Sequence, residues 1–109
     1  MKKGDIWVVK LPSKFGREQS GTRPGIVIAD TKTDLVLIIP LTSNLGALKK
    51  LPFTFEIKKS SNNGLEKDSV ALIFQIQSLD RKRFLSKIGE LDNTEVEIIN
   101  QAIRKMLSL

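Results

Sequence analysis

The sequence predicts a mainly β fold that ends in one C-terminal helix. Short apolar segments fill the first two thirds of the 109 residues and are separated by Gly, Pro, Ser, Asn and Asp. A helical pattern of apolar residues follows only after residue 91. The apolar segments predict five strands, over residues 6–11, 25–29, 35–41, 52–57 and 69–76.

The strand segments differ in how they should be buried. Apolar and polar residues alternate strictly over 53–58, which is typical of an antiparallel strand with one buried and one solvated face. Segments 35–39 and 70–74 are apolar throughout, which indicates strands covered on both faces. That cover has to come from a helix or from a second subunit.

The predicted helix begins at Asp92, with Glu95 at the third helical position, as in a capping box. Apolar residues then recur at helical spacing: Val96, Ile99, Ala102, Ile103, Met106 and Leu107. A shorter helical turn is expected over 81–87, ended by Gly89. With no repeat and no linker in the sequence, residues 1–109 are expected to form a single domain.

Composition narrows the classes of function. Eighteen Lys and Arg against twelve Asp and Glu give a net charge of +6, which favours a polyanion such as nucleic acid. The alternative is ordinary surface charge. The basic runs 49–50, 58–59 and 81–83 could likewise bind a polyanion or be solvated surface patches. The absence of Cys and His leaves zinc almost no ligands, so neither a metal nor a cofactor is expected. Without a signal peptide or a 20-residue apolar run, a soluble, cytoplasmic protein with no membrane partner is expected.

Three polar loops, over 12–22, 42–51 and 58–67, connect the predicted strands. The first exceeds the usual 2–5 residues of a hairpin loop. It carries Lys14, Arg17, Glu18 and Gln19. Long polar loops on a small β domain are more often functional than structural.

Several motifs along the chain resemble the MazF/PemK toxin family of type II toxin–antitoxin systems. They are Gly4-Asp5-Ile6-Trp7, the run 16–28 with Arg23-Pro24, Pro40-Leu41-Thr42-Ser43, the run 64–70 and the run 75–84. The resemblance implies an SH3-like antiparallel barrel of five or more strands, of the MazF/CcdB toxin type, assembled as a homodimer. It implies a ribosome-independent, sequence-selective endoribonuclease acting on single-stranded RNA, an mRNA interferase. It also implies a cognate antitoxin with an acidic, disordered C-terminal tail.

The resemblance makes Arg23 and Thr42 catalytic. The ribose 2′-hydroxyl would attack the phosphate, leaving a 2′,3′-cyclic phosphate and a 5′-hydroxyl without a metal. Proline at position 24 favours extended backbone at Arg23, whose guanidinium matches two phosphate oxygens. Ser43 is a substrate-binding candidate beside Thr42. The structural alternatives are a surface arginine at a strand start and a hydroxyl that caps a turn.

The first loop supplies the remaining candidates near this centre. Glu18, taken as the only carboxylate near it, would accept the proton of the 2′-hydroxyl or position Arg23. Gln19 would read a base edge, Phe15 would stack on a base and Arg17 would bind the substrate. The alternative for these residues is a solvated loop.

Two departures from relatives limit what can be carried over. Some relatives have an Arg-x-Asp pair where this chain has Leu72-Ile73-Phe74, so that pair cannot act here. Others have arginine where this chain has Gln77, which is a further substrate-binding candidate, so the base preference is not transferable. Phe74 is expected in the core, and Trp7 in the core or a dimer interface. A non-catalytic barrel that binds a partner, a gyrase-directed toxin and a ribosome-associated domain remain alternatives.

Overall fold

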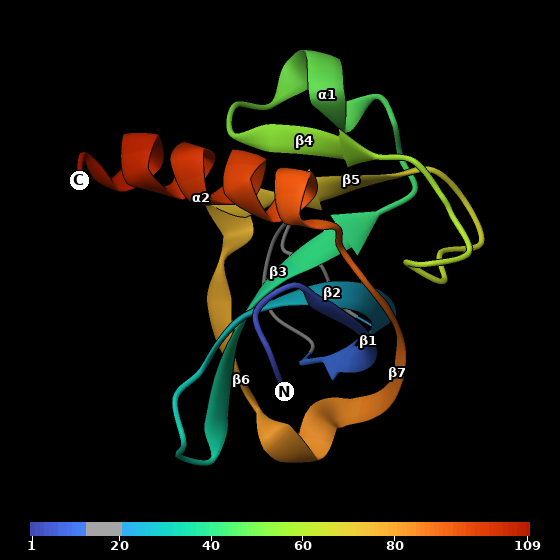
Figure 1. Cartoon of the computed structure of the whole chain (residues 1–109), viewed down its shortest axis with the longest axis vertical. Helices are drawn as coiled ribbons and strands as arrows, with labels where there is room; N and C mark the ends of the chain where they lie inside the picture. Colours follow the sequence, from blue (N-terminus) through green and yellow to red (C-terminus); the bar gives the residue numbers. More distant parts are fainter. Residues whose placement is uncertain (13–20) are drawn as a thin grey trace.

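A computed structural model of the chain describes residues 1–12 and 21–109. Within these ranges it contains seven strands, two α-helices and two 3-10 turns, with α2 last in the chain (Figure 1). The strands are β1 (Asp5–Leu11), β2 (Gly21–Asp30), β3 (Leu35–Thr42), β4 (Thr54–Ile57), β5 (Ser69–Leu72), β6 (Gln77–Asp80) and β7 (Phe84–Glu90). The helices are α1 (Ala47–Lys50) and α2 (Asn93–Leu107), and the 3-10 turns are η1 (Ile73–Gln75) and η2 (Arg81–Arg83).

All strand pairs in the described ranges are antiparallel, which confirms the predicted fold class. The strand order is β4-β5-β3-β2-β1-β7, and β6 pairs with the first half of β3. Strands β4 and β7 are the two ends of this path and do not pair with each other, so the sheet is open and the barrel is not closed by hydrogen bonding. Register shifts within β1–β7 and β2–β3 interrupt the ladders as β-bulges do, and bulges bend strands. In Figure 1 the strands curve around one another.

Each of the five predicted strands is present, but the last third of the sheet was misjudged. The strand predicted over 69–76 ends at Leu72, where η1 turns the chain into β6. The helical turn predicted over 81–87 is present only over 81–83, as η2, because β7 begins at once at Phe84. Strand β7 pairs with β1 over residues 84–90, and this tertiary pairing overrides a weak local preference.

Helix α2 covers the core, as predicted from its apolar spacing. The Asp92 carboxylate accepts a hydrogen bond from the Glu95 amide at 2.8 Å, and the Asp92 amide donates to Glu95 Oε1 at 3.2 Å, so the capping box is confirmed. Ile99 of this helix is buried against a cluster that includes Ile6, Ile26 and Ile39. No helix in the described part of the chain is long and apolar enough to span a bilayer.

Two smaller clusters complete the packing. Ala47 of α1 covers Val70 and Leu72, with Phe74 partly buried against them, so a helix supplies part of the cover expected over this apolar strand. Trp7 packs partly buried on the second cluster, and its ring meets Phe84 edge-on with centroids 5.9 Å apart. Phe74 and Trp7 therefore both contribute to packing.

Candidate active site

A cavity of about 370 Å³ lies where the start of β2, the end of β3 and the connection between β4 and β5 meet. Arg23, Thr42 and Ser43 line it together, so residues far apart in the sequence meet at the position that the motifs indicated. The other lining residues are Val8, Thr22, Pro24, Leu41, Gly64, Leu65, Glu66, Lys67, Ser69 and Ile88. The cavity thus combines hydroxyl, cationic and carboxylate groups with apolar side chains in its lining.

The register of β2 against β3 explains why Arg23 and Thr42 meet. Gly25 pairs with Pro40. Arg23 lies two residues before Gly25, and Thr42 lies two residues after Pro40. The ladder ends at the pair of Gly25 and Pro40, but the same antiparallel register continued by two residues brings Arg23 and Thr42 opposite each other, with both side chains on one face. Arg23 also pairs with Val9 of β1. The backbone that carries the guanidinium is therefore held in place by pairing as well as by Pro24.

The side chain of Arg23 has a donor that no residue in the described part of the chain uses. Its Nε is buried and makes no hydrogen bond to any residue in the described ranges. A buried donor without a partner costs about 1–3 kcal/mol, so such groups in native proteins need an explanation. An anion bound in the cavity would supply the missing acceptor.

The sequence allowed two roles for the Thr42 hydroxyl, capping a turn and contacting the substrate, and the structure is compatible with both. The residue is only 8% exposed, and its Oγ1 accepts a hydrogen bond from the Asn44 amide at 3.2 Å. The hydroxyl therefore caps the turn after β3. Because this bond uses only a lone pair, the hydroxyl proton remains available to an oxygen in the cavity. The structural and the functional interpretations of Thr42 are thus compatible.

The cavity also contains a carboxylate that sequence reasoning missed. Glu66 and the adjacent Lys67 line it, so the prediction that Glu18 is the only carboxylate near this centre is wrong. The two residues lie in the loop over 58–67, which the sequence had marked as functional, and within the 64–70 motif. Their proximity to Arg23 comes from the pairing of β5 with β3 and could not be read from spacing.

The structure bears on only one of the other predicted site residues, Gln77. Phe15, Arg17, Glu18 and Gln19 lie outside the described residues, so their roles stay predictions. Gln77 does not line the cavity; it pairs with Ile38 at the β3–β6 ladder, and its Nε2 donates to the Gln75 carbonyl at 3.2 Å.

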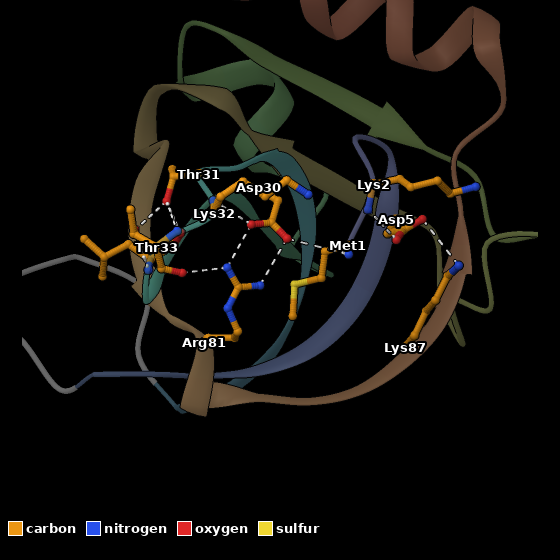
Figure 2. Close-up of polar contacts among 10 residues, drawn as sticks. Met1, Lys2, Asp5, Asp30, Thr31, Lys32, Thr33, Arg81 and Lys87 are labelled. Carbon is orange, nitrogen blue, oxygen red and sulfur yellow. Dashed lines mark hydrogen bonds and ion pairs between the residues drawn. The ribbon is translucent and has the colours of Figure 1, made fainter.

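A different arginine is bound at the opposite end of β2. Arg81 donates from both terminal nitrogens to the two carboxylate oxygens of Asp30, at 3.1 and 2.8 Å, and to the Thr33 carbonyl at 2.7 Å (Figure 2). These hydrogen bonds hold the pKa of Asp30 well below its usual range and raise the pKa of Arg81. The first residue of the basic run 81–83 therefore has its guanidinium committed to an internal contact.

Comparison with known proteins shows which family the chain belongs to. Residues 2–107 match the family described as PemK-like, MazF-like toxin of type II toxin–antitoxin system. Endoribonuclease MazF of Staphylococcus saprophyticus is 33% identical, and the alignment covers 100% of this chain and 92% of that protein. Endoribonuclease EndoA of Bacillus subtilis is 31% identical, with 100% and 96% covered.

Among solved structures, MazF of Deinococcus radiodurans superposes with a TM-score of 0.80 at 24% identity, covering 100% of this chain and 97% of that one. That likeness supports the fold, and the match over nearly the whole length of the sequence shows the family. This chain belongs to the PemK-like, MazF-like family of toxins of type II toxin–antitoxin systems.

Proposed function

We propose that this toxin is an endoribonuclease that cleaves single-stranded RNA in the cavity formed by Arg23 and Thr42. Family membership and two full-length relatives named as endoribonucleases support the activity. The observation that supports this location is that the buried Nε of Arg23, which has no partner among residues 1–12 and 21–109, and the hydroxyl of Thr42 meet in one cavity. Both groups can donate to phosphate oxygens, and the net charge of +6 favours a polyanionic substrate.

The proposed reaction is an attack of the ribose 2′-hydroxyl on the adjacent phosphorus. The new O–P bond forms as the bond to the 5′-oxygen breaks, which leaves a 2′,3′-cyclic phosphate and a 5′-hydroxyl. Arg23 and Thr42 stabilise the charge that grows on the phosphorane oxygens, a task for preorganised donors. This route needs no metal, because the nucleophile belongs to the substrate.

Cleavage also requires two proton transfers, one from the 2′-hydroxyl and one to the leaving 5′-oxygen. Glu18 is proposed to take the proton of the 2′-hydroxyl or to position Arg23, and Arg23 is proposed to protonate the leaving oxygen. Ser43, which lines the cavity, is proposed to bind the substrate beside Thr42. Phe15, Arg17, Gln19 and Gln77 are proposed to bind the RNA substrate.

The proposed partners follow from the family. A type II toxin acts with a cognate antitoxin. We expect that protein to have an acidic, disordered C-terminal tail, which suits a basic toxin. We also expect a homodimer, with messenger RNA in the cytoplasm as the substrate.

The test is cleavage of a long RNA by purified protein in EDTA, with mapping of the product ends. Cuts that carry a 2′,3′-cyclic phosphate and a 5′-hydroxyl are expected. Arg23→Ala should abolish them, whereas Arg104→Ala, an exposed arginine of α2, should leave them unchanged. Absence of protein-dependent cuts in varied RNAs would overturn the proposal. RNA retained on the protein but left intact would favour a binding function.

A further inference from the structure

We propose that Glu66 reads the amino group of one RNA base beside the cut phosphate, and so helps to set the sequence preference. This inference rests on the proposed endoribonuclease function and on the placement of Glu66 in the same cavity as Arg23 and Thr42. It assigns the residue a specificity role, separate from the catalytic donors.

The loop that carries Glu66 is held by one buried side chain. Asn63 is only 2% exposed, and its Oδ1 accepts hydrogen bonds from the amides of Ser60 and Leu65, both at 3.0 Å. Its Nδ2 donates to the Lys58 carbonyl at 2.8 Å. One asparagine thus organises the loop from residue 58 to residue 65.

The same loop lies directly on β7 at two glycines. A Cβ on Gly64 would fall 2.0 Å from the Ile88 carbonyl oxygen, and Gly64 has a φ of +68°. A Cβ on Gly89 would fall 2.3 Å from the Asn63 carbonyl carbon. The Glu90 amide also donates to the Asn62 carbonyl at 3.0 Å. Contact between the two backbones therefore leaves little room for the loop to shift.

The neighbours of Glu66 are fixed on both sides. Before it, the Leu65 amide is bound to Asn63; after it, the Lys67 carbonyl accepts a hydrogen bond from the buried Ser69 hydroxyl at 2.9 Å. Glu66 itself is exposed. A side chain that projects from a fixed backbone to an open cavity is suited to discriminate between ligands.

Charge decides which part of the RNA Glu66 contacts. A carboxylate accepts hydrogen bonds and is repelled by phosphate, whereas Arg23 and Lys67 in the same cavity attract phosphate. Single-stranded RNA exposes the base edges, where cytosine, adenine and guanine present amino groups. Uracil presents carbonyl oxygens on both sides of its single N–H, and these repel a carboxylate. We therefore expect a base with an amino group, in preference to uracil, at the position that Glu66 reaches.

The experiment is cleavage of an RNA library with random bases, followed by sequencing of the cut ends. Wild-type protein, Glu66→Gln and the control Glu97→Gln are compared, because Glu97 is an exposed carboxylate on α2, outside the Arg23–Thr42 cavity. The wild type should favour amino bases over uracil at one position near the cut. Glu66→Gln should reduce that preference about tenfold at this position alone, whereas Glu97→Gln should keep it.

Two results would overturn the inference: an unchanged preference in Glu66→Gln, or a wild type that favours no amino base near the cut. A uniform loss of rate at all sites, with loss of the acidic limb of the pH–rate profile, would also overturn it and assign Glu66 as a proton acceptor instead. If the wild type cuts no RNA, the proposed function fails instead. Asn63→Ala, assayed where circular dichroism shows it folded, should blur the preference at the same position.

Discussion

An arginine lies at each end of β2, and the two differ in how many of their donors are hydrogen-bonded. At the end near Asp30, Arg81 makes three hydrogen bonds, two to a carboxylate and one to a carbonyl. At the start of the strand, the Nε of Arg23 is buried without a partner among the described residues. The seven steps along the strand from residue 23 to residue 30 span about 23 Å. An arginine that stabilises the fold has its donors satisfied internally, whereas one that binds a ligand keeps a donor for it.

The turns at the two ends of β3 also differ in how many of their polar groups are bound internally. Between β2 and β3, Asp30 accepts the Lys32 amide at 2.9 Å, and Thr33 Oγ1 accepts the Leu35 amide at 3.1 Å. The N-terminal amine lies 3.7 Å from the same aspartate. Figure 2 shows the guanidinium of Arg81 and the amine of Met1 meeting at the Asp30 carboxylate. After β3, the Thr42 hydroxyl accepts a hydrogen bond from the Asn44 amide and donates to no group in the described part of the chain, which leaves its proton available to the cavity.

The largest expected effect is on catalysis at the cavity. Arg23→Ala should lower the rate of RNA cleavage by about 100-fold or more, because a preorganised donor to the phosphorane is lost. The urea midpoint of unfolding should not fall, since the Nε of Arg23 stabilises nothing that the structure describes and the substitution removes a buried donor without a partner there. Cleavage of a fluorogenic RNA and urea titration measure the two effects. A large loss of stability with an unchanged rate would reverse the comparison.

A smaller effect on the rate is expected from Thr42→Val, which retains the shape of the side chain and removes its hydroxyl. The cleavage rate should fall about tenfold, and Thr42→Ser should restore most of it. Loss of the bond to the Asn44 amide should also lower stability by about 1 kcal/mol. If Thr42→Ser is as slow as Thr42→Val, the hydroxyl does not act on the substrate.

At the other end of β2, Arg81→Ala should lower stability and leave the rate within about twofold at 20 °C. The substitution leaves the Asp30 carboxylate, whose side chain is only 11% exposed, without its main partner. A lower urea midpoint with normal cleavage is therefore expected. The exposed cation Lys58, whose Nζ lies 3.9 Å from Glu56, provides the control, because Lys58→Ala should barely move the midpoint.

The smallest effect is a pH dependence that requires acid to be seen. Arg81 lowers the pKa of Asp30 in the folded state, so ionised Asp30 stabilises the fold. That contribution is complete above the unfolded-state pKa of about 3.9 and is lost as the pH falls below it towards the folded-state pKa. Asp30→Asn should therefore lose less stability than the wild type between pH 5 and pH 3, an approximate window set by these values. Equal losses in urea titrations at the two pH values would contradict the assignment.

Local sequence signals predicted the elements that depend on local chemistry. Helix α2 begins where its capping residues stand and buries the face that its apolar spacing indicated. Strand β7 was missed because its residues are exposed or half-buried and carry little apolar alternation. Its pairing with β1 decides its conformation, and the same is true of the short strand β6 on β3.

By itself, the sequence determined the strand-rich class, the terminal helix and the candidate pair Arg23 and Thr42. Apolar periodicity, capping residues and family motifs each depend on residues that are close together in the sequence. Only the tertiary structure decided which groups share the cavity, because the register of β2 against β3 and of β3 against β5 sets that neighbourhood. Glu66 joined the site, and Gln77 did not line the cavity, for this reason. It also distinguished Arg81 from Arg23, since only the fold shows which arginine has its donors already satisfied.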